Sequence, residues 1–182
     1  MRKLFIALIA SALALGGQAY AQEGFSVGAS VGYANIEFDD SSLTFDGSDT
    51  GYKIFGTWMF SENWGIEGGW VDMGTPDDTV LGIPVKIDVS GIDVFFVGSM
   101  PVADNFDLFG KAGMVSWDAD FTIGDSEVGV ESGSDDGEDL ALGFGGRWKL
   151  GEQFGIRGEY EWFDISDADS VWVVSVGVDF FF

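Results

Sequence analysis

The sequence predicts an all-β chain that folds as an eight-stranded antiparallel up-and-down β-barrel and spans a membrane. The clearest observation is the C-terminal segment from Trp172 to Phe182, where every second residue is large and apolar and smaller or polar residues lie between. Alternation with period two indicates a strand with two different faces, and this length suits a tilted crossing of a bilayer. Similar segments precede it, and their connections alternate between short and long.

The N-terminus has the pattern of a secretory signal peptide. Arg2 and Lys3 precede an apolar run from Leu4 to Leu15, and Ala19-Tyr20-Ala21 has the form of a signal-peptidase site. We therefore expect cleavage between Ala21 and Gln22, with residues 1–21 removed and residues 22–182 forming one barrel domain. An uncleaved anchor is the less favoured alternative, because the apolar run is short for a spanning helix.

The composition limits the chemistry that this chain can perform. It has no Cys and no His, which argues against disulfides, thiolate sites and hydrolases that need a His base. All 31 acidic residues follow the predicted signal peptide, which removes two of the 8 basic ones, so the mature charge is 6 − 31 = −25. Such a surface repels nucleic acid and attracts cations and basic partners. We expect no enzyme activity and no cofactor.

The first three predicted strands span residues 25–38, 50–60 and 64–72. Phe25 to Tyr33 alternate with serines and glycines, and the apolar positions of the second strand alternate with Lys53 and Thr57. Glu67 lies opposite the tryptophans of the third. The remaining strands are predicted at 86–100, 106–119, 139–150, 154–163 and 171–182.

The connections favour one orientation in a membrane. Residues 61–63, 101–105 and 151–153 are short and carry turn residues. Residues 39–49, 73–85, 120–138 and 164–170 are mostly longer, are acidic, and are expected to be loops. Short turns on one side and long loops on the other are typical of bacterial outer-membrane barrels, with the turns in the periplasm.

Six of the seven tryptophans fall on the apolar faces of the predicted strands. They indicate two aromatic girdles flanking an apolar band in contact with outer-membrane lipid. A soluble barrel, with its apolar residues inside, is the disfavoured alternative. The predicted girdle residues are Trp58, Trp64 and Trp148 near the short turns, and Tyr52, Trp70, Trp162 and Trp172 near the long loops.

The opposite faces carry most of the charged strand residues and are expected to line the lumen. An eight-stranded barrel is filled by its own side chains, so opposite charges there should pair. This cluster either fills and rigidifies the interior or acts as a gate. Lys149 and Glu161 lie near strand ends and are expected to be solvated. The predicted luminal cluster comprises Glu67, Lys111, Arg157, Glu159, Lys53 and Asp93.

The third long loop is rich in carboxylates, which are hard oxygen ligands suited to calcium or magnesium. The weak candidates are Asp118, Asp120, Asp135 and Asp136. The spacing does not match an EF-hand, because Ile123 occupies the required glycine position and Gly129 that of the closing Glu. We therefore predict diffuse attraction of divalent cations and no dedicated metal site.

Three segments, WGIEGGWVDMG, FVGSMPVADNFDLFGKAGM and FGIRGEYEWF, together resemble the OmpA-like and OmpX-like small barrels, the porin family of outer-membrane β-barrel domains. The resemblance implies a luminal salt-bridge cluster at Glu67, Lys111, Arg157 and Glu159. It also implies that the outer-membrane assembly machinery recognises the terminal aromatic, Phe182.

These observations favour a non-enzymatic, monomeric protein of the bacterial outer membrane, with a packed polar interior. Its expected role is envelope integrity or surface interaction through acidic extracellular loops. A narrow channel for water or small solutes, gated by the luminal charges, is one alternative. An adhesin that binds a basic partner or divalent cations is another.

Overall fold

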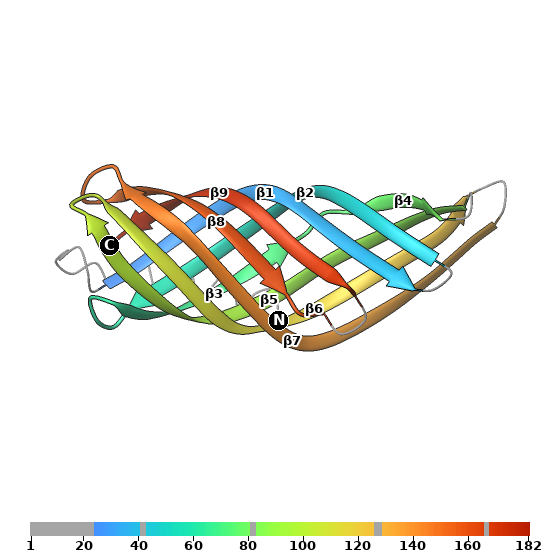
Figure 1. Cartoon of the computed structure of the whole chain (residues 1–182), viewed down its shortest axis with the longest axis horizontal. Coiled ribbons are helices and arrows are strands. Elements are labelled where there is room, and N and C mark those ends of the chain that lie inside the picture. The colour runs from blue at the N-terminus through green and yellow to red at the C-terminus, as the bar shows by residue number, and fades with distance from the viewer. Residues whose placement is uncertain (1–23, 41–42, 81–82, 126–128, 166–167) are drawn as a thin grey trace.

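The structure is a computed structural model that describes residues 24–40, 43–80, 83–125, 129–165 and 168–182 (Figure 1). Within these residues it contains nine β-strands, all paired antiparallel. Their bounds are β1 (Gly24–Asp40), β2 (Leu43–Met59), β3 (Trp64–Asp72), β4 (Asp77–Val80), β5 (Ile83–Ala103), β6 (Phe106–Asp125), β7 (Gly129–Lys149), β8 (Phe154–Phe163) and β9 (Ser170–Phe181).

The strands close into a ring. The sheet order is β3-β2-β1-β9-β8-β7-β6-β5-β4, and a further pairing of β3 with β5 joins its two ends. β4 continues the wall beyond the end of β3: it pairs with the same edge of β5, and its Asp78 side chain accepts a hydrogen bond from the backbone N–H of Asp46 on β2. Eight strands therefore form the barrel, and the predicted fold class is confirmed. No helix in the described part of the chain is long and apolar enough to span a membrane.

Three of the predicted long loops are largely strand, so their assignment as loops was wrong. Residues 43–49 belong to β2, and β4 occupies 77–80. β6 and β7 continue through most of the third predicted loop, paired from Phe106↔Trp148 to Asp125↔Gly129. Acidic side chains are compatible with these extensions because each strand satisfies backbone hydrogen bonds through its neighbour.

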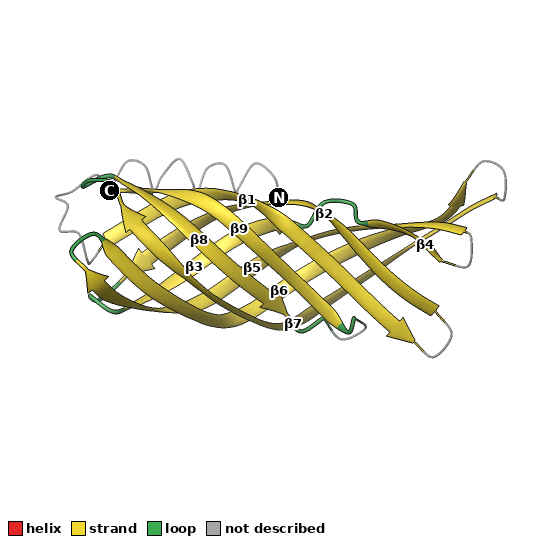
Figure 2. Cartoon of the chain, turned by 45° about the horizontal axis from the view of Figure 1, so that its top comes forward, coloured by secondary structure: helices red, strands yellow, loops and turns green. Residues whose placement is uncertain are grey.

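The ring is not equally tall around its circumference. β8 and β9 begin to pair at Phe163↔Val171, whereas β5, β6 and β7 continue well past that level. In Figure 1 these three strands form the tip at the right, at the opposite end from the C-terminus. Figure 2 shows the same projection from a second direction.

Side chains alternate between the outside of the barrel and its lumen. Tyr52, Trp58, Trp64, Trp70 and Trp148 are exposed on the outer surface, with Trp58 at 56%. Trp162 and Trp172 share that surface and are half-buried. The seventh tryptophan, Trp117, points inward and is 5% exposed.

The lumen is not polar throughout, contrary to the predicted packed polar interior. Past the charged residues, toward the projecting end, the inward positions become apolar, as at Val71, Met73, Val115 and Trp117. Further residues, all on strands except Ile165, complete this apolar luminal layer: Ala34, Ile36, Phe45, Val89, Ala141, Phe163, Ile165, Val171 and Val173.

One inward glycine marks a close approach of two strands. A Cβ added at Gly113 on β6 would lie 1.9 Å from the backbone oxygen of Val94 on β5. Real Cβ atoms do not come this close to backbone atoms, so the present spacing of β5 and β6 requires glycine here.

The C-terminus lies at the seam between the first and last strands. The backbone N–H of Phe182 donates to the oxygen of Phe25 at 3.0 Å, and their rings are 5.8 Å apart. The ring of Phe180 lies 5.0 Å from that of Phe182. The predicted cleavage site, Ala21 and Gln22, lies outside the described residues.

Candidate functional site

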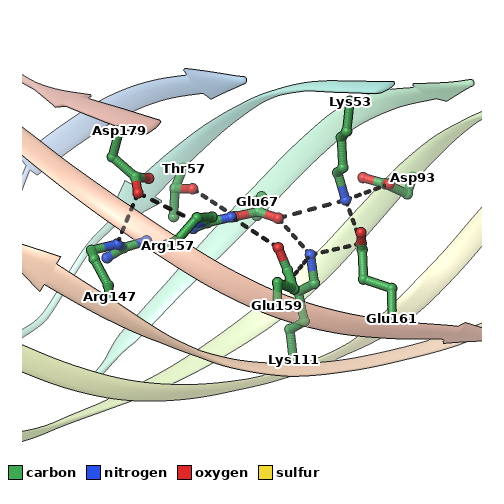
Figure 3. A network of polar contacts seen from close by, with 10 residues as sticks. All are labelled: Lys53, Thr57, Glu67, Asp93, Lys111, Arg147, Arg157, Glu159, Glu161 and Asp179. Carbon is green, nitrogen blue, oxygen red and sulfur yellow. Dashed lines mark hydrogen bonds and ion pairs between the residues drawn. The ribbon is translucent and has the colours of Figure 1, made fainter. Parts of the chain in front are cut away.

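Glu67 on β3 is the centre of a buried charge network inside the barrel (Figure 3). One of its oxygens accepts a hydrogen bond from Lys111 Nζ at 2.8 Å and lies 3.8 Å from Lys53 Nζ. The other accepts from Arg157 Nη1 and from the hydroxyl of Thr57, each at 2.9 Å. A single carboxylate thus joins cations from β2, β6 and β8.

The side of the network nearer the projecting end is built around Lys53. Its Nζ lies 2.7 Å from Asp93 and 2.6 Å from Glu161. Glu161 also contacts Lys111 at 2.8 Å and is 1% exposed, so its predicted solvation was wrong. The strand end is not a solvent boundary here because the apolar luminal layer covers it.

The side nearer the short turns is built from two arginines. Arg157 Nη1 lies 3.4 Å from Glu159, and the Nε atoms of Arg157 and Arg147 each lie 3.4 Å from Asp179 Oδ2. Arg147 and Arg157 are direct cross-strand neighbours, so Asp179 offsets the repulsion between them. The sequence reasoning omitted Asp179, although its polar position between apolar neighbours in β9 was a usable signal.

Lys149 also differs from its prediction. Its Nζ lies 2.9 Å from Asp107, and its side chain is 18% exposed, so it is paired at the rim of the lumen. Lys111 lies 2.5 Å from Glu159 in addition to its contacts with Glu67 and Glu161. All six predicted luminal residues are therefore brought into one network, together with Glu161, Arg147 and Asp179.

Aromatic rings lie among these charges. Lys111 Nζ lies 4.3 Å from the centre of the Phe95 ring, and Arg157 lies 4.1 Å from that of Phe55 and 4.9 Å from that of Phe109. Cation–π contacts of this kind strengthen when water is excluded. These aromatic partners could not be predicted from the sequence, because alternation identifies the inward face but not which side chains meet across the lumen.

The arrangement favours a packed, ion-paired plug. Four cations, Lys53, Lys111, Arg147 and Arg157, face five carboxylates: Glu67, Asp93, Glu159, Glu161 and Asp179. The formal charges nearly cancel, and each cation has a carboxylate within 3.4 Å. Glu159 and Glu161, which share a face of β8, both serve as partners of Lys111.

The candidate metal ligands do not converge. Asp118 and Asp136 are cross-strand neighbours on the outer face, Asp120 lies two residues further along that face, and Asp135 lies on the opposite face. Within the described residues, no group of three or more acidic side chains is placed to hold a metal ion.

The comparisons with known proteins agree with this architecture. The family model described as "outer membrane protein beta-barrel domain" matches residues 4–180. No curated protein sequence matches this chain. Among solved structures, Ail, the attachment invasion locus protein of Yersinia pestis, is 20% identical with a TM-score of 0.57, covering 87% of this chain and 99% of Ail.

Two further barrels share the fold. Neisserial surface protein A is 13% identical with a TM-score of 0.67, covering 87% of this chain and 97% of its own. OprG from Pseudomonas aeruginosa is 17% identical with a TM-score of 0.59, covering 89% and 98%. These structural likenesses concern the fold, while the family match spans nearly the whole chain. The chain therefore belongs to the outer membrane protein β-barrel domain family and is a small barrel of the bacterial outer membrane.

Proposed function

We propose that this barrel is a non-enzymatic surface-interaction protein that binds an extended, basic segment of a partner along the projecting part of β7. The observation that carries the proposal is an unpaired strand edge. β7 pairs with β6 down to Gly129 but with β8 only from Ala141 onward. Among the described residues, no strand pairs with the other side of β7 over 129–138. Such an edge can accept an added strand.

The direction of the free backbone groups follows from one hydrogen bond. The oxygen of Leu140 accepts from the N–H of Asp164 at 2.8 Å, on the side of β7 away from β6. In an antiparallel ladder, the groups that point to one side recur at every second residue. The N–H and C=O groups of Val130, Ser132, Ser134, Asp136 and Glu138 therefore point to the open side.

Charge indicates the chemistry of the partner. This part of β7 carries Glu131, Asp135, Asp136, Glu138 and Asp139 and no basic residue. Two copies of the edge would repel each other, whereas a Lys- or Arg-rich segment would be attracted. Ail was solved with the heparin analogue sucrose octasulfate, a polyanion. The acidic edge of this chain favours the opposite sign of ligand.

The test uses a fluorescent, extended peptide with alternating lysines and the mature protein in nanodiscs of zwitterionic phospholipid. Ser134→Pro removes one N–H from the open side while leaving the pairing with β6 intact, and Ser134→Ala keeps that N–H. We expect the proline variant to bind about tenfold more weakly and the alanine variant to bind normally. Equal binding by both variants would reject strand addition, and absence of binding to the wild-type protein would reject the proposed partner.

A narrow channel is the second candidate, because the network contains exchangeable pairs. Lys53 and Lys111 both contact Glu67 and Glu161, so a cation could change partners without losing all its contacts. The apolar luminal layer opposes conduction, since it has few groups that replace the hydration of an ion. Planar-bilayer recordings of the wild-type protein and of Glu67→Ala/Lys111→Ala test this candidate. Small openings that change in the variant would support a gate.

A further inference from the structure

A groove crosses the outer surface of the barrel over β5, β6 and β7. Its volume is about 690 Å³, and Trp64, Phe96, Phe144 and Tyr160 contribute to its walls. The strand registers explain the hollow: Trp64 pairs with Gly98, Gly98 with Gly110, Gly110 with Phe144, and Phe144 with Tyr160. Two neighbouring glycines thus lie between large rings on either side.

The open space is centred on β6. A Cβ added at Gly110 would meet a single atom, the backbone oxygen of Gly143, at 3.9 Å. Gly98 differs, because the Trp64 ring lies over it, 2.9 Å from where its Cβ would be. Ala112, the next outward residue on β6, extends the shallow floor. The groove is therefore bounded by fixed rings and has room above Gly110 and Ala112.

The position of the groove defines the chemistry of its occupant. It lies on the wall that faces lipid, and its outward-facing lining is apolar apart from the polar tips of Tyr160 and the two tryptophans, Trp64 and Trp162. A flexible hydrocarbon chain gains dispersion contacts from such walls that an unfilled groove would forfeit. We propose that this groove holds one acyl chain of a phospholipid from the periplasmic leaflet as a bound lipid.

The two ends of the groove distinguish between lipid sources. β5, β6 and β7 each carry an acidic residue on the outer face just beyond the apolar band, in the direction of the projecting end. These residues are Asp88, Asp118 and Glu138. Their carboxylates would repel the phosphates of lipopolysaccharide in the outer leaflet. At the other end, Trp64 follows the short turn at residues 61–63, and the outward residues Met100 and Leu108 are uncharged. The short turns beside this end are also acidic, at Glu62 and Asp104, but the zwitterionic headgroup of phosphatidylethanolamine has no net negative charge for them to repel.

The test counts the lipids that remain bound to the mature protein. The protein is reconstituted in phosphatidylethanolamine vesicles, extracted with mild detergent and analysed by native mass spectrometry, with and without added lipopolysaccharide. Gly110→Leu/Ala112→Leu fills the groove. Gly158→Leu is the matched control, because it also adds a leucine in open space on the outer surface but lies outside the groove. Resistance of the unheated barrel to detergent on gels verifies folding.

We expect the wild-type protein and Gly158→Leu to retain one phospholipid. In the filled variant, the fraction of protein that retains this lipid should fall about tenfold. Equal retention by the filled variant, or no retained lipid in the wild-type protein, would overturn the site. Preferential retention of lipopolysaccharide would overturn the choice of leaflet. A dimer that disappears in the filled variant would show that a second copy covers this face and would also reject the proposal.

Discussion

Replacing Glu67 by alanine removes the carboxylate that joins three cations at the centre of the lumen. Lys53 and Lys111 would keep Glu161, at 2.6 and 2.8 Å, so neither would be left alone. Arg157 would lose its 2.9 Å contact and keep only partners at 3.4 Å. The Thr57 hydroxyl would lose the carboxylate that accepts its hydrogen bond at 2.9 Å.

The expected cost follows from these losses. Breaking a buried ion pair by removing one partner costs about 3–5 kcal/mol. Because Arg157 keeps other carboxylates nearby, we expect a loss of stability toward the lower end of this range. The lost hydrogen bond of Thr57 adds about 1 kcal/mol. We therefore expect Glu67→Ala to lower the free energy of unfolding by about 4 kcal/mol. Asp107→Ala is the matched control: Asp107 is buried, but its partner Lys149 lies at the rim of the lumen and can turn to water, so the loss should be smaller, about 1–2 kcal/mol.

The assay is equilibrium unfolding of the mature protein by urea in phospholipid vesicles, followed by tryptophan fluorescence and by gel mobility of the unheated sample. Replacing both partners, as in Glu67→Ala/Arg157→Met, should restore part of the lost stability, because no unpaired charge then stays buried. A loss below about 1 kcal/mol for Glu67→Ala, or one equal to that of Asp107→Ala, would refute the view that the network stabilises the barrel.

Three further predictions concern other parts of the barrel. Gly113→Ala should impair refolding, because its Cβ would lie 1.9 Å from a backbone oxygen, whereas Gly158→Ala should refold like the wild-type protein in a gel-mobility assay. Trp117→Ala should cost about 3–5 kcal/mol in the urea assay, since it leaves a cavity in the apolar luminal layer. The backbone N–H groups of Thr75 and Thr50 lower the pKa of Asp49, so its stabilising contacts should persist above about pH 4 and weaken as the pH falls further. Amide exchange at Thr75 should show this loss in the wild-type protein and not in Asp49→Asn.

The sequence predicted the barrel, and which residues line its lumen, more reliably than it predicted the lengths of the strands. Alternation with period two identifies which residues share a face, and this rule placed Glu67, Lys111 and Arg157 together. It does not identify contacts across the lumen, so the rings of Phe55, Phe95 and Phe109 beside the cations were missed. Acidic composition favours loops in a prediction from sequence, yet a paired strand in water tolerates charges as well as a loop does.

A reversal of polarity along strands such as β1 and β6 explains both the misjudged loops and the closed lumen. On β1, the apolar residues Val31 and Tyr33 face outward. Beyond them the apolar positions shift by one residue, so Ala34 and Ile36 face inward. β6 reverses in the same way between Met114 and Val115. The change of phase marks where lipid gives way to water, because a wall in lipid is apolar outside and one in water is apolar inside. The projecting end is thus organised like a soluble barrel with its own core, and that core closes the lumen. A surface that projects on a core of this kind can present an unpaired strand without depending on the membrane for its shape.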